Sequence, residues 1–189
     1  MDHQRNIETP AARKFVLSRG LPKTGQITSY IAGDDGAYET GWWRGRLNAN
    51  NKTRYRLSFP ASDTVFDLAT GLMWAANGNG EGCNYGNPET WLNSLAYTAN
   101  LDFGGFDDWR LPNVKELLSL IEYDAALAVG ALPLIAEPPF SNTPLLPHWT
   151  STTTVNLTTS AQIVNFAQGN VVAVAKVDSW HLRAVRGGV

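Results

Sequence analysis

The side chains that could carry acid–base or metal chemistry are few in this sequence and lie far apart. Its histidines are His3, His148 and His181, and none of them has the His-x-x-x-His spacing of a helical zinc site. His148 and His181 each stand beside a tryptophan, so folding could bring their rings together. Two ligands do not complete a zinc site. We therefore favour a structural or ligand-contacting role for this pair, and we predict no metal and no cofactor.

Nucleophilic catalysis has equally little support. Ser151 stands between two threonines rather than in the Gly-x-Ser-x-Gly turn that exposes a catalytic serine. Cys83 is the single cysteine, so no intrachain disulfide can form and the redox compartment is not indicated. The sequence therefore predicts a protein that is not an enzyme.

Two glycine-containing segments invite comparison with ligand-binding loops, but turns explain both of them. The segment 33–36 reads Gly-Asp-Asp-Gly, and its spacing does not match an EF-hand calcium loop. The segment 77–86 is glycine-rich, but no lysine follows it, as a phosphate-binding loop would require. We predict a plain turn at 33–36 and a surface loop at 77–86.

Charge and composition exclude two classes of partner. The 189 residues include 17 acidic and 15 basic side chains without a basic run, which argues against nucleic-acid binding. The longest apolar runs fall far short of the ~18 residues that a membrane-spanning helix needs, so we predict no membrane insertion. The length suits one domain, which we place at 21–189, after a polar N-terminal arm at 1–20.

Two short helices are predicted. Asn87, Pro88 and Glu89 favour a helix start, and the spacing of apolar residues extends this helix over 88–99. Its expected buried stripe consists of Trp91, Leu92, Leu95, Ala96 and Ala99.

The second helix is expected over 114–123, and it follows the most informative segment of the chain. Pro112 keeps the preceding residue extended, Asn113 can cap the helix, and Glu116 can complete a capping box. Trp109 and Arg110 are thereby fixed at its entrance. We expect Trp109, Arg110, Pro112 and Glu116 to form a structural motif, with Trp109 buried and Arg110 bonded to backbone carbonyls or to a carboxylate such as Asp108.

The remaining signals are those of short strands. They are expected at 55–59, 65–67, 72–74, 148–152 and 182–186, with a hairpin of 162–166 and 171–177 across the turn at 167–170. The proline-rich segment 125–147 predicts a long ordered loop. The fold class is therefore α+β, with two short helices packed on a small, mostly antiparallel sheet and with long loops.

Three motifs carry a resemblance to a known family. They are Trp109-Arg110-Leu111-Pro112-Asn113-x-x-Glu116-Leu117, Thr70-Gly71-Leu72-Met73-Trp74 and Val185-Arg186-Gly187-Gly188. In this order they resemble the Lcl C-terminal domain family, named after the last domain of bacterial collagen-like adhesins, from about Leu21 to the C-terminus. The resemblance implies a C-type-lectin-like fold related to formylglycine-generating-enzyme-like proteins. Those enzymes use two reactive cysteines, which Cys83 alone cannot supply.

The resemblance also implies where a ligand would bind, because C-type-lectin-like domains present ligand-binding residues on their late strands and loops. This part of the sequence is rich in hydroxyl and amide side chains interspersed with aromatic rings. The predicted ligand-binding residues are Trp149, Thr152, Thr154, Asn156, Asp178, Ser179, Trp180 and His181. Two alternatives remain open: that threonine is simply favoured on exposed strands, and that both tryptophans belong to the core.

The expected function is ligand recognition without catalysis, of the adhesin or receptor-binding type, with a glycan or a surface protein as partner. Receptor-binding proteins diversified by retroelements share this fold, and the relatives imply a homotrimer to which the arm at 1–20 contributes. The alternative is an enzyme or a structural assembly component on the same scaffold. Trp42 and Trp43 offer a second possible binding strip. The first residues lack a secretory signal, so we expect exposure on a virion or cell surface without a classical signal peptide.

Overall fold

The computed structural model describes residues 23–26, 28–38, 54–57, 63–123, 132–135 and 138–187. The arm predicted at 1–20 and the tryptophan pair at 42–43 lie outside the described residues, as does part of the loop predicted at 125–147.

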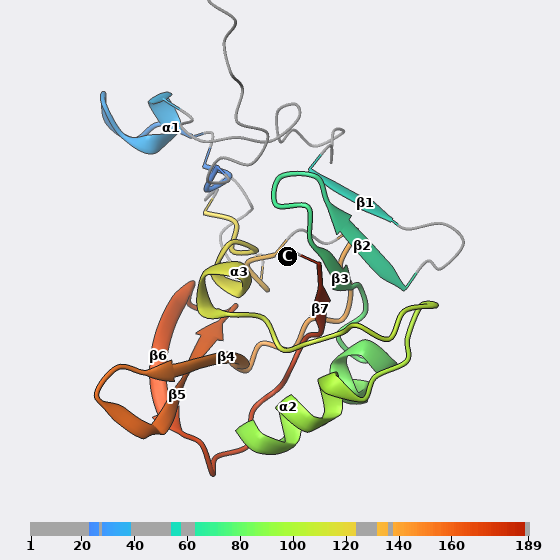
Figure 1. The fold of residues 1–189 in the computed structure, drawn as a ribbon. Coiled ribbons are helices and arrows are strands. Elements are labelled where there is room, and N and C mark those ends of the chain that lie inside the picture. The colour runs from blue at the N-terminus through green and yellow to red at the C-terminus, as the bar shows by residue number, and fades with distance from the viewer. Residues whose placement is uncertain are drawn as a thin grey trace, which may run out of the picture.

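The first of two antiparallel sheets joins the middle of the chain to its C-terminal part. It contains β1 (Tyr55–Leu57), β2 (Thr64–Asp67), β3 (Met73–Ala75) and β7 (Val185–Arg186), in the order β1-β2-β3-β7. Trp74 of β3 lies opposite Val185, so the last strand closes the sheet on the side away from β1. Figure 1 shows this sheet on one side of the molecule.

The second sheet is a meander of three longer strands. It contains β4 (His148–Thr154), β5 (Leu157–Asn165) and β6 (Asn170–Ala175), in the order β4-β5-β6. A tight turn joins β4 to β5, and Asn156 adopts a left-handed conformation there with a φ of 63°. The hairpin predicted between β5 and β6 is confirmed, but β5 starts at Leu157 instead of residue 162.

The helical elements are α1 (Asp35–Tyr38), the 3₁₀ segment η1 (Glu81–Gly86), α2 (Trp91–Ala99) and α3 (Val114–Leu118). The capping box predicted for α3 is confirmed in full. This helix ends five residues earlier than predicted, because the chain turns away and Glu122 donates its backbone N–H to the Leu134 carbonyl. With α+β content, two small antiparallel sheets and few short helices, the fold class agrees with the prediction.

The start of α2 differs from the prediction. Thr90 caps this helix, because Glu89 is held in extended conformation by two backbone hydrogen bonds with Trp180, of 2.9 and 3.0 Å. The buried face also differs: Leu92 is 70% exposed, whereas Ser94 and Thr98 are buried. The hydroxyls of both buried residues donate to carbonyls one turn earlier in the helix, which removes the cost of burying them.

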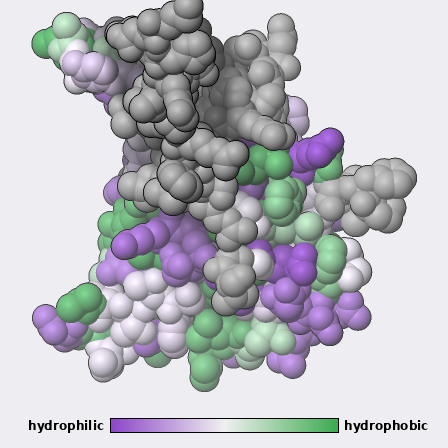
Figure 2. Space-filling model, turned by 45° about the horizontal axis from the view of Figure 1, so that its top comes forward, coloured by the Kyte–Doolittle hydropathy of each residue, from purple (hydrophilic) through white to green (hydrophobic). Residues whose placement is uncertain are grey.

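The main core lies between the two sheets, with α3 packed into it. Trp74 of β3, Leu117 of α3 and Val164 of β5 are completely buried in one cluster. A second cluster surrounds Trp109, and a third contains Trp149 and Leu111. On the face drawn in Figure 2, hydrophobic and hydrophilic residues form small neighbouring patches.

A buried ion pair fixes the turn between β2 and β3. Asp67 is completely buried and accepts two hydrogen bonds from the Arg54 guanidinium, of 3.1 and 2.9 Å. The same carboxylate also accepts from the Ala69 backbone and from the Thr70 hydroxyl. In the motif at 70–74, Thr70 therefore has a structural role: its hydroxyl stabilises the buried charge of Asp67.

Candidate functional site

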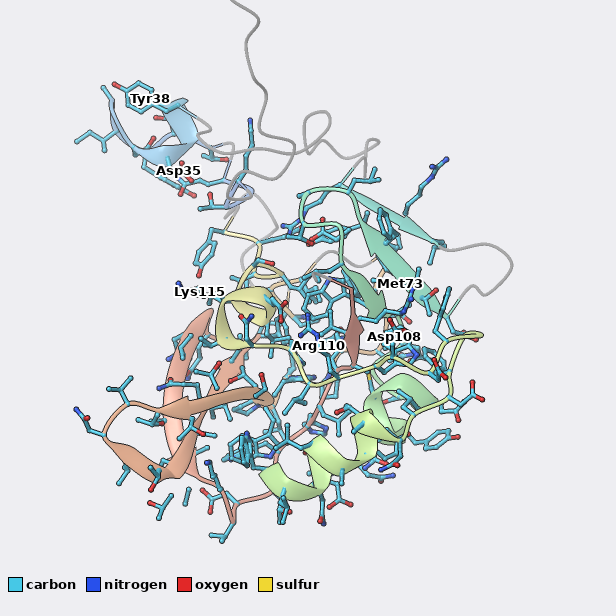
Figure 3. All side chains as sticks on the ribbon, viewed as in Figure 1. Asp35, Tyr38, Met73, Asp108, Arg110 and Lys115 are labelled. Carbon is cyan, nitrogen blue, oxygen red and sulfur yellow. The ribbon has the colours of Figure 1, made fainter. Side chains whose placement is uncertain are left out.

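Arg110 ties the entrance of α3 to the end of the chain. Its backbone pairs with Val185 of β7, and Figure 3 shows its side chain between α3 and β7. The guanidinium donates to both carboxylate oxygens of Glu116, at 2.8 and 2.7 Å, and to the Gly187 carbonyl at 2.8 Å. These bonds to Glu116 raise the pKa of Arg110. The side chain thus contacts both kinds of acceptor that the sequence suggested.

The carboxylate that pairs with Arg110 is not Asp108. Asp108 instead accepts from Arg186 of β7 at 2.5 and 3.1 Å, and this interaction lowers the pKa of Asp108. Trp109 is buried, and its indole N–H lies within hydrogen-bonding distance of the Phe103 and Phe106 carbonyls. Trp109 therefore packs into the core, whereas its neighbours Asp108 and Arg110 lie outside it. Asp108 forms an ion pair with Arg186, and Arg110 forms one with Glu116.

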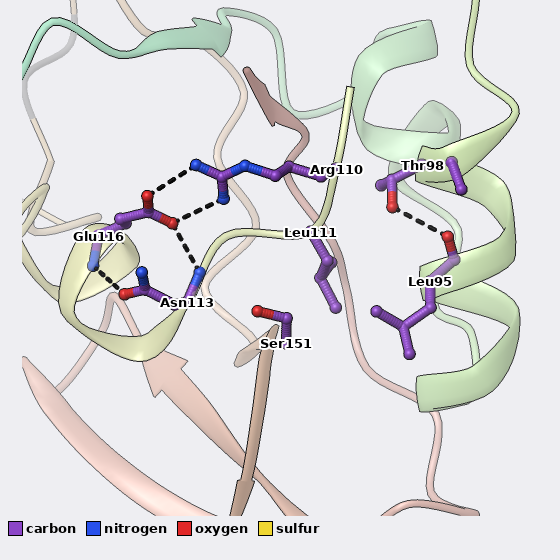
Figure 4. A pocket seen from close by; sticks show the side chains of 8 residues that line it. Leu95, Thr98, Arg110, Leu111, Asn113, Glu116 and Ser151 are labelled. Carbon is purple, nitrogen blue, oxygen red and sulfur yellow. Dashed lines mark hydrogen bonds and ion pairs between the residues drawn. The ribbon is translucent and has the colours of Figure 1, made fainter. Parts of the chain in front are cut away.

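An open cleft of about 550 Å³ adjoins Arg110. One wall comes from α2, the opposite wall from the entrance and first turn of α3, and Ser151 of β4 lies between them (Figure 4). The lining residues are Leu95, Thr98, Ala99, Arg110, Leu111, Asn113, Glu116 and Ser151. The volume lies within the range of small-molecule sites in proteins.

Several polar groups of the cleft keep hydrogen-bonding capacity. The guanidinium of Arg110 has five N–H donors, and its bonds to Glu116 and Gly187 engage only part of them. Within the described part of the chain, the Asn113 amide nitrogen and the Ser151 hydroxyl have no hydrogen-bond partner. The side-chain oxygen of Asn113 is occupied by the Glu116 backbone N–H. The spare groups are therefore mainly donors, and the residues that carry them line the cleft.

The walls of the cleft are firmly connected to β4. Ser151 donates its backbone N–H to the Pro112 carbonyl at 2.8 Å, and the Thr152 hydroxyl accepts from the Val114 backbone at 3.0 Å. On the other side, the indole N–H of Trp91 in α2 donates to the Thr150 carbonyl at 2.8 Å. Successive residues of one strand thus fix both walls.

Two of the predicted ligand-binding residues are buried in the structure. Trp149 is completely buried, and its indole N–H donates to the Glu89 carbonyl at 2.7 Å. His181 is also buried, and its carbonyl accepts from the Trp149 backbone at 2.8 Å. The Trp149 ring therefore has no exposed face in this structure, and His181 is only 7% exposed.

The other predicted ligand-binding residues occupy different environments. The Thr152 hydroxyl is engaged by α3, and Asn156 forms the tight turn before β5. Trp180 is half-buried against the Trp149 cluster. The remaining three are Thr154, which is half-buried at the end of β4, and Asp178 and Ser179, which are exposed after β6.

The two C-terminal histidines do meet, as their positions suggested. Their ring centroids lie 5.5 Å apart, and His148 also packs edge-on against Phe166. Burial, with the nearby positive charge of Arg183, holds the pKa of His148 well below its ordinary value, and burial also lowers the pKa of His181. Among the residues that the structure describes, no group of three or more metal-binding side chains is present.

Sequence reasoning did not find the cleft. Leu95 and Ala99 belong to the predicted buried stripe of α2; both line the cleft, where Leu95 also packs against the Trp149 cluster and Ala99 is exposed. The spacing of Leu95, Thr98 and Ala99 places these three residues on one face of a helix. The other residues of the cleft, at 110–116 and 151, are distant in sequence, so the sequence does not show that they adjoin this face.

The fold and the cleft define a small α+β domain with a preformed surface site. The family model of the Lcl C-terminal domain matches residues 63–186, and the chain belongs to this family. The match covers the strands from β2 onward and every residue of the cleft, and it begins later than the Leu21 suggested by the motifs. No curated protein matches the chain. Within the described residues, no helix is long and apolar enough to cross a membrane.

Proposed function

We propose that this chain is a non-catalytic recognition domain that binds a neutral glycan in the cleft between α2 and α3. The observation that carries the proposal is the set of spare donors on Arg110, Asn113 and Ser151, which line the cleft together with the apolar side chains of Leu95 and Leu111. Sugars offer hydroxyl oxygens to such donors and C–H faces to such apolar groups. Because Glu116 compensates the charge of Arg110, the cleft favours a neutral ligand over an acidic one.

The same geometry argues against catalysis. Hydrolysis of a glycosidic bond generally requires two carboxyl groups on either side of the bond. Glu116 is the only acidic residue among those that line the cleft, and its carboxylate is occupied by Arg110 and by the Asn113 backbone N–H. Ser151 has no histidine beside it in the cleft lining, so it lacks the base that a nucleophilic serine needs.

Family membership supports an adhesin-like setting for this activity. In that setting the domain would be exposed on a cell or virion surface and would bind glycans of another surface. The same proposal includes a C-type-lectin-like fold. It also includes sequence variation of the late strands, driven by a retroelement. The predicted homotrimer depends on the arm at 1–20, which lies outside the described residues.

Glycan binding can be tested with two matched variants, in each of which one alanine of α2 is replaced by phenylalanine. Ala99 lines the cleft and Ala96 does not, although both are exposed on the same helix. We expect Ala99→Phe to fill the cleft and to weaken binding to a panel of immobilised neutral oligosaccharides at least tenfold. Ala96→Phe should bind as the original protein does.

Two results would contradict the proposal. If the unmodified chain binds no member of the panel, glycan recognition is wrong, and a surface protein becomes the ligand to test. If binding survives Ala99→Phe but is lost in Trp180→Ala, the ligand contacts the exposed residues after β6 instead of the cleft.

A further inference from the structure

The outer edge of β6 has no partner strand within the part of the chain that the structure describes. Among the described strands, β6 pairs only with β5, and Figure 1 shows it at the outer side of the second sheet. The backbone N–H of Lys176 donates to the Thr159 carbonyl, which fixes the alternation along the strand. Val172 and Val174 therefore direct their N–H and C=O groups to β5, whereas those of Val171, Ala173 and Ala175 point outward.

This edge lacks the features by which proteins normally protect such strands. Its sequence, Asn-Val-Val-Ala-Val-Ala, contains neither a charge nor a proline, and β6 pairs with β5 in an unbroken register without a bulge. Val171 and Val172 are 36% and 42% exposed, and Val177 just beyond the strand is 80% exposed. An uncharged, β-branched edge of six residues is about 20 Å of open hydrogen-bonding surface.

The nearest charge does not guard the edge. The Lys176 ammonium lies 2.9 Å from the Thr153 hydroxyl of β4 and 3.9 Å from the centre of the Trp91 ring. These contacts hold the side chain across the face of the sheet, towards β4 and α2. The edge itself is left to pair with another strand.

We propose that the partner is β6 of a second copy of this chain, paired antiparallel about a twofold axis at Ala173. In this register Ala173 faces Ala173 of the second copy, and Val171 faces Ala175. The outward-pointing residues then form three pairs: two backbone hydrogen bonds join the Ala173 residues, and in each outer pair the Ala175 N–H donates to the Val171 carbonyl, whereas the Ala175 carbonyl already accepts from the Asp178 N–H. The two sheets become one continuous sheet in the order β4-β5-β6-β6-β5-β4.

The charge pattern favours a second copy over an unrelated strand. In the twofold register, Lys176 stands opposite Asn170 and Asp178 stands opposite Gln168, so no two like charges face each other. Val172 stands opposite Val174, and pairs of β-branched side chains across strands are favourable. An isologous contact of this kind closes at two copies, which avoids growth into a fibre.

This inference is independent of glycan binding, but it affects how binding would work. Ser151 of the cleft is on β4, and β5 separates β4 from β6, so pairing at β6 leaves the cleft open in both copies. A dimer would then present two clefts on one rigid sheet and could bind a multivalent surface with higher avidity than a single domain.

The pairing and its register can be tested with two double variants of the full chain. Val171→Lys with Ala175→Lys places lysines opposite each other in the twofold register and should separate the copies. Val171→Lys with Ala175→Glu places each lysine opposite a glutamate of the second copy and should restore pairing. Both variants change the same two positions, and thermal unfolding of each establishes that it is folded.

Sedimentation velocity at micromolar concentration provides the measurement. We expect the unmodified chain and the Lys/Glu variant to sediment as dimers of the 20.6 kDa chain, and the Lys/Lys variant to sediment as a monomer. A monomeric unmodified chain would overturn the proposal, and so would a trimer, which would instead support the homotrimer implied by the family resemblance. Identical masses for two folded double variants would overturn it as well, because pairing at this register requires them to differ.

Discussion

Acidification should destabilise this protein through His148, well above the pH range in which carboxylates titrate. The His148 ring is completely buried, and neither ring nitrogen has a well-formed hydrogen bond within the described structure. Burial, Arg183 and His181 together keep its pKa far below 6.5. The folded protein therefore leaves His148 neutral at pH values at which the unfolded chain already binds a proton.

The sign and size of the effect follow from this difference. Stability contributed by neutral His148 is complete above a pH of about 6.5 and is lost as the pH falls below it, because protons then favour the unfolded chain. Between pH 7.5 and pH 5.5 the loss is about 1.4 kcal/mol for one such histidine. His181 adds a decrement in the same direction, because its pKa is lowered too.

The assay is urea unfolding followed by tryptophan fluorescence at pH 7.5 and pH 5.5, with His148→Leu as the test variant. Leucine has a similar volume and needs no hydrogen bond, so the variant should fold and should lose about 1.4 kcal/mol less than the original protein over this range. Asp34 and Asp108 have lowered pKa values and contribute only at lower pH. Equal losses in the two proteins would refute the reasoning.

Further predictions concern the fold that carries the cleft. Asp67→Asn removes a buried carboxylate that accepts two hydrogen bonds from Arg54 and two more from the turn between β2 and β3, and it should cost about 3–5 kcal/mol in urea unfolding; a loss below 1 kcal/mol, on the order of a surface pair, would contradict this. Asn113→Ala removes the cap of α3 and should cost about 1 kcal/mol, with Tm as the measure. Gly82→Ala places a Cβ 2.5 Å from the Ala75 Cβ and 2.9 Å from the Phe103 ring, and it should therefore lower Tm.

The sequence was sufficient for elements whose signals are local. The capping box of Asn113 and Glu116 uses residues three positions apart, so α3 starts where the pattern predicts. The strands and their turns follow from alternation and from residues that tolerate a positive φ, such as Gly169. Elements whose ends depend on distant residues were less predictable. Asn87, Pro88 and Glu89 form a sound local helix start, but the bonds between Glu89 and Trp180 override it.

The location of the site was not predictable for a related reason. Alternation along a strand shows that neighbouring residues face opposite ways, but not which face is covered. Here both faces of β4 are covered, by α2 on one side and by α3 on the other, so Trp149 is buried and Thr152 is bound to a helix. The cleft is the space that remains between these two helices beside Ser151.

The rigidity of the cleft links its composition to recognition. Binding is weakened when side chains must be ordered at the moment of contact, and Arg110 would carry a large cost of this kind if it were free. Glu116 and Gly187 already hold its guanidinium, and the capping box already holds Asn113. The ordering cost is thus met during folding, by the same bonds that stabilise α3. Arg110, Asn113 and Glu116 can therefore stabilise the fold and also line a binding surface.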